Sequence, residues 1–255
     1  MPRCYQISRP STALESGGAL NKYVNANGFT AWQGFDERGY ETRFFDWEQM
    51  AAGVVPVEPE TVTVGSVVFV RRALRTLGVE PAPLDYPVRL TGYLGRKVWR
   101  TTWAEVRARV DEPGRSVFVK PVEQDKAFSG YVVSSFRDLI RTAKWPDAMR
   151  LWASEPVPFV SEWRFFVRGG RVVGVGHYKG DPFRYPDASV VRAALDGYAG
   201  DAPAAFGIDF GVVESGGTFL VEVNDGFSLG CLGLGPLTYS GLLEDRWRQL
   251  VGTAG

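Results

Sequence analysis

Two short apolar runs, at 206–210 and 219–223, constrain the fold of this chain more than any other feature. They flank a segment with two adjacent glycines, which predicts a strand–turn–strand hairpin. In such a hairpin Glu222 and Asn224, two residues apart, point to the same face, and Asp209 joins them from the neighbouring strand. Oxygen ligands with open positions suit Mg²⁺, which takes further ligands from water and substrate phosphates. The pattern therefore indicates nucleotide chemistry.

The alternative interpretation of this hairpin is an amphipathic structure whose outer face is simply polar. Val221 and Val223 alternate with the polar pair, so one face is apolar and the other carries only acids and an amide. The segment that follows, 226–230, is a loop able to approach a ligand closely, and it contains Ser228. These neighbours favour the metal-site interpretation.

Composition narrows the classes of protein to which the hairpin can belong. A chain of 255 residues with 45% apolar content can bury a core, as one large domain or as two or three small lobes. Lysine plus arginine equals aspartate plus glutamate, at 29 each, so no global charge recruits nucleic acid or an anionic membrane. Cys4 and Cys231 are too few for a disulfide framework, and the N-terminal segment has no apolar stretch of signal-peptide length. We therefore expect a soluble, cytoplasmic protein.

The single histidine, His177, limits the chemistry further. A serine hydrolase triad or a histidine-rich zinc site would have to be built around this one residue, so the sequence argues against both. We expect His177 to be a polar contact at a strand end. Catalysis must then rest on carboxylates, lysines, arginines and a metal ion.

The first hundred residues alternate short strands and helices, and a linker follows them. Ser66 is a good N-cap and Gly78 a good stop for a helix between them. The proline-rich run at 81–87 is a linker by composition. The other expected elements here are strands over 3–8 and 40–45 and a helix-rich segment over 19–38.

After the linker, the sequence predicts a helix over 102–110 and a strand over 116–121. The strand ends at Lys120, because Pro121 cannot continue a ladder. A lysine in this position is ordinarily just solvated. Here a loop with lysine, serine and glycine follows at 125–130 and leads into another strand, and such a loop can fold over phosphates.

A second hairpin is predicted from a proline-rich extended segment at 155–158, the strand after it and a Gly-Gly turn at 169–170. Glu162 and Arg164 share one face of its first strand. The alternative to a functional role is an ion pair between these two side chains on a surface strand, which stabilises little.

Lys120 at a strand end, the serine–glycine loop, an acidic hinge and the Asp…Glu-x-Asn triplet together resemble the ATP-grasp superfamily of carboxylate–amine ligases. Glu155 and Glu162 are seven residues apart, like that family's hinge and ribose-binding acids, and the triplet matches its metal-binding residues. The resemblance covers about 65–235. It is strongest to small amidoligase-like members, which also carry a stretch like 64–70 before a helix.

The resemblance implies an α+β chain with the ATP-grasp fold. An N-terminal α/β lobe would span 1–85 and the ATP-grasp region 86–255. Within that region it implies a small central lobe over about 90–155 and a C-terminal antiparallel-sheet lobe over about 156–255.

The resemblance also implies roles for individual positions, with ATP and Mg²⁺ as cofactors. ATP would be held by Arg100, Lys120, Lys126, Ser129, Gly130, Glu155, Val157, Phe159 and Glu162. Mg²⁺ would be held by Asp209, Glu222 and Asn224. Arg164 and Lys120 would act on the transferring phosphoryl group, and we expect substrate contacts from Lys179, Arg184 and Ser228.

The adenine and phosphate positions depart from the family pattern in two ways. Pro156 and Pro158 have no N–H for adenine, so Val157 or Phe159 must supply it. Arg100 stands where the family usually has a lysine, which changes a point charge into a planar fork.

A third departure concerns a missing positive charge. Several relatives have an arginine two residues before the first metal-binding acid, where this chain has Gly207. Arg164, or Lys179 and Arg184, would have to replace it.

The implied function is ATP-dependent ligation of a carboxylate to an amine, on a small molecule or a peptide. Such ligases phosphorylate the carboxylate and let the amine attack the acyl phosphate, which needs positioned cations rather than a histidine base. Two alternatives stay open: a phosphotransferase on the same fold, and a nucleotide-binding module without turnover. The presence of all three metal ligands counts against the second.

Overall fold

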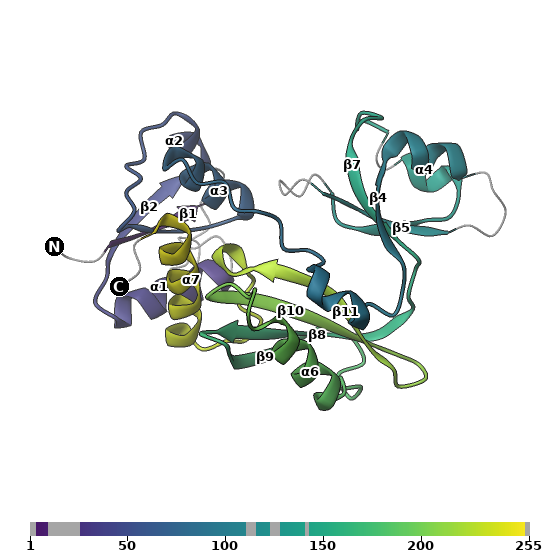
Figure 1. Cartoon of the computed structure of the whole chain (residues 1–255). Coiled ribbons are helices and arrows are strands. Elements are labelled where there is room, and N and C mark those ends of the chain that lie inside the picture. Colours follow the sequence, from purple (N-terminus) through teal and green to yellow (C-terminus); the bar gives the residue numbers. More distant parts are fainter. Residues whose placement is uncertain (1–3, 10–25, 111–115, 123–127, 141–142, 253–255) are drawn as a thin grey trace, which may run out of the picture.

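Three lobes, each built on its own β-sheet, make up the chain (Figure 1). The computed structural model of the protein describes residues 4–9, 26–110, 116–122, 128–140 and 143–252. The N-terminal sheet is parallel, and the other two sheets are antiparallel. This α+β arrangement confirms the predicted fold class.

The N-terminal lobe packs helices on a three-stranded parallel sheet. Its elements are β1 (Cys4–Arg9), α1 (Ala26–Glu37), β2 (Glu41–Asp46), α2 (Trp47–Ala51), β3 (Val62–Val64) and α3 (Val67–Thr76), and its strand order is β2-β1-β3. The Ser66 hydroxyl caps α3 by accepting from Phe69 N–H at 3.3 Å, and Gly78 follows the helix with a φ of 74°. The predicted start and stop of this helix are confirmed.

The last helix of the chain, α7 (Pro236–Val251), completes the core of this N-terminal lobe. It packs against α1 so closely that a Cβ on Gly34 would stand 2.0 Å from the Pro236 carbonyl oxygen. Trp247 of α7 is buried in the same cluster as Phe35 of α1. The predicted lobe boundaries stay a prediction, and the sequence analysis did not find this helix.

The central lobe is a four-stranded antiparallel sheet covered by a short helix. Its elements are η2 (Val88–Tyr93), β4 (Val98–Thr102), α4 (Trp103–Arg109), β5 (Val117–Pro121), β6 (Tyr131–Val133), α5 (Phe136–Leu139) and β7 (Arg150–Ser154), with strand order β4-β7-β5-β6. Trp103 is fully buried against Val119 and Leu151. Thr102 and Glu105 form a capping box that starts α4 where predicted. Strands β4 and β7 were not predicted.

The C-terminal lobe carries both predicted hairpins. Its elements are β8 (Phe159–Arg168), β9 (Arg171–Gly180), α6 (Ala188–Tyr198), β10 (Ala205–Val213), β11 (Thr218–Asp225) and η4 (Gly226–Ser228), with strand order β11-β10-β8-β9. Asp209 stands opposite Glu222, and Gly207 stands opposite Asn224, as the strand period requires. The other face of the sheet packs on α6, which was not predicted, through residues such as Phe206.

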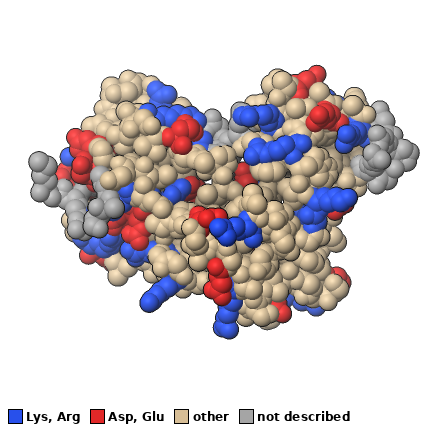
Figure 2. Space-filling view, viewed as in Figure 1, with Lys and Arg blue, Asp and Glu red and all other residues tan. Residues whose placement is uncertain are grey.

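A hollow between the N-terminal and central lobes opens onto the C-terminal sheet, and side chains of both charges show in it (Figure 2). Helix α3, strand β5 and strand β11 each supply part of its lining, so the three lobes meet here. None of the described helices combines the length and apolar character that crossing a lipid bilayer requires.

Candidate active site

Two adjoining cavities lie where the lobes meet, and they share their charged lining. The hinge cavity, of about 530 Å³, is lined by the hinge, 154–157 and Phe159. The linker cavity, of about 360 Å³, is lined by the linker, 82–85, and by the loop at 227–230. Five residues line both cavities: Lys120, Ser129, Gly130, Arg164 and Glu222.

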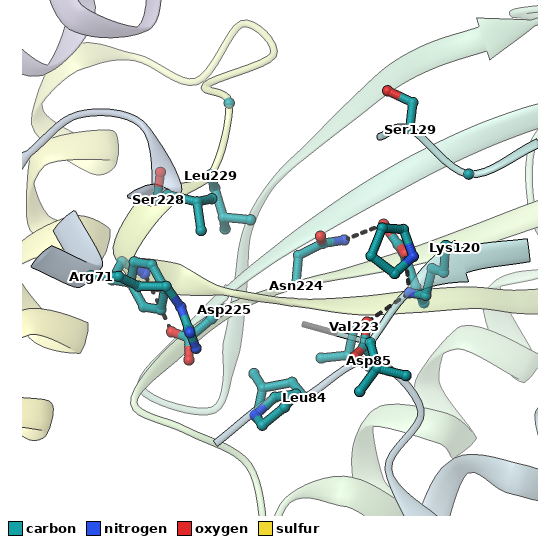
Figure 3. Close-up of a pocket in the computed structure, with 18 of the residues that line it drawn as sticks. Arg71, Leu84, Asp85, Lys120, Ser129, Val223, Asn224, Asp225, Ser228 and Leu229 are labelled. Atoms are coloured by element: carbon teal, nitrogen blue, oxygen red, sulfur yellow. Dashed lines mark hydrogen bonds and ion pairs between the residues drawn. The ribbon is translucent and has the colours of Figure 1, made fainter. Parts of the chain in front are cut away.

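Lys120 is held between two carboxylates where the cavities join. Its Nζ donates to Glu222 Oε2 and to Asp85 Oδ1, each at 2.7 Å, and only 12% of its side chain is exposed. Figure 3 shows Lys120 and Asp85 pointing toward each other from different elements. Burial alone would lower the pKa of Lys120, but the negative charges of Glu222 and Asp85 outweigh it and raise the pKa above its ordinary value. Lys120 is therefore a permanent cation.

Arg164 on β8 forms a bidentate ion pair with Asp209 on β10. Its Nε donates to Oδ1 and its Nη2 to Oδ2, both at 2.7 Å. The stem of Arg164 runs over Gly207, where an added Cβ would lie 3.0 Å from Arg164 Cδ. Of the residues predicted to replace the charge missing at position 207, Arg164 is thus the one that occupies the space beside it.

The three predicted metal ligands lie within hydrogen-bonding reach of one another. Asn224 Nδ2 donates to Asp209 Oδ2 at 3.1 Å and to Glu222 Oε1 at 3.0 Å. No group of three or more His, Cys, Asp or Glu side chains able to hold a metal ion occurs among the described residues, so the amide of Asn224 is needed to complete the set. Two carboxylates and an amide fit a hard divalent cation, which would share oxygens that now accept from Lys120 and Arg164.

Both carboxylates of this set are ionised at neutral pH, for different reasons. Burial raises the pKa of Asp209 to about 6, although the contact with Arg164 acts in the opposite direction. Burial also acts to raise the pKa of Glu222, but the charge and hydrogen bond of Lys120 prevail and lower it to about 2. Two negative charges therefore face the shared lining.

The hinge cavity has a flat apolar side built on a glycine. The ring of Phe159 lies over Gly211, where a Cβ would stand 2.2 Å from the ring. Phe159 N–H donates to Val157 O at 2.9 Å, whereas Val157 N–H makes no hydrogen bond within the described part of the chain. Of the two amides that the sequence left open for adenine, that of Val157 is the available one. Glu155, which also lines the cavity, accepts from Lys97 N–H at 3.0 Å.

Glu162 and Lys179 form an ion pair on the wall of the hinge cavity. Lys179 Nζ donates to Glu162 Oε1 at 2.5 Å, and Tyr178 OH donates to Oε2 at 2.9 Å. Glu162 therefore does not pair with Arg164, and the interpretation of that strand as a simple Glu162–Arg164 surface pair is wrong. Lys179 lines the hinge cavity and not the linker cavity where a second substrate would enter.

The linker cavity has mostly apolar walls. Val67 at the start of α3, Leu84 in the linker and Phe227 in the loop after β11 face it. Ser228 also lines it, and its hydroxyl donates to Gly65 O at 2.8 Å, which joins that loop to the start of α3. The charged end of the cavity is the shared set around Lys120.

Three predicted site residues are not brought to the cavities. Arg100 lies in neither lining, and its guanidinium sits 3.7 Å from the centre of the Trp152 ring. Arg184 also lies outside both linings and donates to Glu214 O at 2.8 Å. Lys126 falls outside the described residues. His177 lies in β9 against Trp163, in neither lining, so it is not the strand-end contact that was expected.

The sequence analysis missed a group of residues around Lys120. Asp85 and Tyr86 belong to the linker, where composition signalled only a connection, and Trp152 lies in the strand β7 that was not predicted. Trp152 Nε1 donates to Asp85 Oδ2 at 3.0 Å, and Lys120 Nζ lies 4.5 Å from the centre of the Tyr86 ring. An aspartate between prolines was the available signal, because such runs otherwise carry few charges.

A sheet-bound metal set, a hinge and a small lobe that presents a lysine define the ATP-grasp fold, and comparison with known proteins agrees. Residues 93–242 match the model of an ATP-grasp domain family, the second family of its clade, so the chain belongs to the ATP-grasp proteins of that family. No curated protein matches the sequence significantly.

Solved structures of ATP-grasp proteins share the fold at low sequence identity. D-cycloserine synthetase DcsG superposes with a TM-score of 0.58 at 13% identity, over 96% of this chain and 99% of that one. D-alanine–D-alanine ligase from Bacillus anthracis complexed with ATP gives 0.55 at 12% identity, over 99% of both chains. A RimK domain ATP-grasp protein from Sphaerobacter thermophilus gives 0.54 at 13% identity, over 95% of this chain and 98% of that one.

Proposed function

We propose that the protein is an ATP-dependent carboxylate–amine ligase that works through an acyl phosphate. The observation that carries this proposal is the junction of two cavities at Lys120, Arg164 and Glu222. Ligation of this kind needs a nucleotide and an acceptor on opposite sides of one phosphoryl group, with cations fixed between them. The names of two proteins of similar structure, a D-alanine–D-alanine ligase and a D-cycloserine synthetase, agree with this chemistry.

The hinge cavity is the proposed site for ATP. Its Phe159 ring offers an apolar surface for adenine, and Val157 N–H offers a donor to the base. Glu162, held by Tyr178 and Lys179, offers acceptors for ribose hydroxyls. The triphosphate would then extend toward Lys120, the permanent cation at the junction.

The metal ion belongs on the C-terminal sheet in this proposal. Asp209, Glu222 and Asn224 would hold Mg²⁺, which when bound neutralises phosphate charge and orients the transferring group. Arg164 keeps its guanidinium beside this set because Asp209 fixes both of its donor nitrogens. Its planar fork can stabilise charge that spreads over the phosphoryl oxygens.

The linker cavity is the proposed site for the carboxylate and the amine. A carboxylate oxygen bonds to the γ-phosphorus of ATP, the bond from that phosphorus to the β,γ-bridging oxygen breaks, and ADP leaves. The amine nitrogen then bonds to the acyl carbon, inorganic phosphate leaves, and the amine gives up a proton to solvent or phosphate. Lys120 and Arg164 face both cavities, so they can follow the charge through both steps.

A substrate screen tests this proposal. We expect ADP formation to require a carboxylate and an amine together, and the apolar walls around Leu84 and Phe227 to favour apolar amino acids and dipeptides over polyamines. ADP formed with a carboxylate alone, with a stable phosphorylated product, would identify a phosphotransferase. Nucleotide binding without ADP under any condition would identify a module without turnover.

A further inference from the structure

Asp85 makes contacts to two lobes from within the linker. Its carboxylate accepts from Lys120 Nζ at 2.7 Å and from Trp152 Nε1 at 3.0 Å, both in the central lobe. Its carbonyl oxygen accepts from Val223 N–H at 2.8 Å, in the C-terminal sheet. A single linker residue therefore joins the strand that carries Lys120 to the strand that carries Glu222 (Figure 3).

The backbone of Asp85 is in an unusual conformation. Its φ is 32°, on the left-handed side that residues with a side chain seldom adopt, and that aspartate and asparagine tolerate best. A bridge of the strand type to Val223 fixes the carbonyl in this conformation. Strained non-glycine residues persist where the surrounding structure holds them, and such residues gather at functional sites.

The donor on the other side of Asp85 is itself held in place. The Trp152 ring packs edge-on against Tyr86, with centroids 5.0 Å apart, and its face carries the Arg100 guanidinium at 3.7 Å. Both Asp85 carboxylate oxygens therefore have a fixed direction, and one of them points at Lys120.

Lys120 needs such a second partner because its first partner has another role. In the proposed function Glu222 is a metal ligand, and a cation on Glu222 would weaken its hold on Lys120. A lysine side chain has four rotatable bonds and would then lose its position. Asp85 is not one of the proposed metal ligands, so its contact with Lys120 can remain.

We propose that Asp85 is a positioning residue that keeps the Lys120 ammonium directed at the phosphates once Glu222 engages the metal ion. This inference rests on the proposed use of the hinge cavity for ATP. A purely neutralising Asp85 would act in the opposite direction, because its removal would leave Lys120 more attractive to phosphate. The sign of the effect on ATP affinity therefore separates the two.

The test is calorimetric titration of Asp85→Asn with ATP and with adenosine, at saturating Mg²⁺. Asparagine tolerates the left-handed backbone, so only the charge and one acceptor are lost. We expect ATP affinity to fall about tenfold, adenosine affinity to stay the same and the melting temperature to change little. Unchanged or tighter ATP binding would overturn the proposal.

Two further variants keep the test specific. In a Lys120→Ala background Asp85→Asn should have no additional effect on ATP, because the residue through which it acts is absent. Trp152→Phe removes only the indole donor and should show a smaller loss of the same pattern. Asp201→Asn, which breaks an exposed pair with Arg89, is the matched control and should change neither affinity. Additive losses in the double variant would overturn the proposed role.

The outcomes also separate this inference from the proposed function. If the wild type binds ATP and Asp85→Asn weakens it, but no carboxylate and amine give ADP, only the ligase proposal fails. If ligation is observed and Asp85→Asn binds ATP normally, only the role of Asp85 fails. Absence of ATP binding by the wild type would overturn both.

Discussion

Two buried clusters of charge in this protein use the same residue types and differ in what surrounds them. The α7 cluster consists of Glu244, which accepts from Arg38, Tyr40 and Arg248. The junction cluster consists of Asp85, Lys120, Arg164, Asp209 and Glu222. The first has one carboxylate for two cations and lines neither the hinge cavity nor the linker cavity. The second has three carboxylates for two cations and lines both.

The difference shows how buried charge can serve stability or function. In the α7 cluster the donors satisfy the carboxylate completely, so the cluster can only fasten α7 to the N-terminal lobe. In the junction cluster one net negative charge is left over, which a divalent cation can balance. Substitutions in the α7 cluster should therefore change stability alone, and substitutions in the junction cluster should change turnover or binding.

The largest expected effect is at Glu222. We predict that Glu222→Gln abolishes Mg²⁺-dependent turnover, with a loss on the order of 10²–10³, because it removes a group that helps stabilise developing charge. Asn224→Ala should follow the same pattern. Steady-state ADP release and a thermal melt provide the measurement. The melting temperature of Glu222→Gln should change little, since Lys120 keeps Asp85 as a partner.

Glu214→Gln is the matched control for Glu222→Gln. Glu214 lies in the turn between the same two strands, but its side chain is 84% exposed. Full turnover in Glu222→Gln would remove the metal-site interpretation.

The reverse pattern is predicted at Glu244. Glu244→Gln should leave kcat and KM unchanged and destabilise the fold by about 3 kcal/mol, because it breaks a buried charged network. For a chain of this size that corresponds to a melting temperature lower by about 6–12 °C. A kinetic defect without a change in melting temperature would contradict the comparison.

The stability from Glu244 should also depend on pH. Burial acts to raise its pKa, but the hydrogen bonds from Tyr40, Arg38 and Arg248 prevail and lower it below 4.5. A lowered pKa contributes stability that is complete above the ordinary value and is lost as pH falls through the folded-state value. The difference in melting temperature between wild type and Glu244→Gln should therefore shrink below about pH 4.

Lys120→Ala is expected to separate phosphate binding from base binding. ATP should bind about 10- to 100-fold more weakly, while adenosine should bind as before, because the ammonium contributes through charge. Calorimetric titration with both ligands measures the two. Lys144→Ala removes the same charge from the same lobe at a residue outside both cavities, and serves as control. Equal losses for ATP and adenosine would place Lys120 elsewhere than at the phosphates.

A smaller and purely kinetic effect is predicted at Arg164. Arg164→Lys keeps the charge but loses the planar fork, so kcat should fall about tenfold with less change in the KM for ATP. Arg168→Lys offers a close control, because Arg168 lies on the same strand and makes a similar two-point pair with Asp245. Wild-type kcat in Arg164→Lys would eliminate its proposed role on the phosphoryl group.

The smallest effect concerns a single backbone donor. Val157→Pro removes the free N–H of the hinge in a segment already flanked by prolines, so the chain should fold normally. Adenosine and ATP should both bind more weakly, by about two- to tenfold, as expected for one neutral hydrogen bond. This pattern is opposite to that of Lys120→Ala. A loss for ATP alone would show that the register of the hinge is different.

The parts of the site that follow from strand periodicity were predictable from sequence. Asp209, Glu222 and Asn224 converge because alternation and one Gly-Gly turn fix the register of a hairpin. The place of Arg164 depends on the pairing of β8 with β10, residues that are 45 apart, and no local pattern encodes such a pairing.

Two other features could not be read locally. Asp85 lies in a segment whose composition indicates only a linker, and its contacts come from three separate strands. Helix α7 was hidden because the glycine and proline near its start were interpreted as interruptions. They are its N-cap, Gly235, and its first residue, Pro236, positions that suit both residue types.

The place of α7 in the N-terminal core has a consequence for how the chain acquires its structure during synthesis. The central lobe is contiguous in sequence, so all of its strands are available once the ribosome has released residue 154. The N-terminal lobe is made first, yet it lacks Trp247 and the rest of α7 until almost the whole chain has emerged. The lobe that is translated first is therefore the last to be completed, and its unfinished apolar surface is exposed to chaperones for most of the time that translation takes.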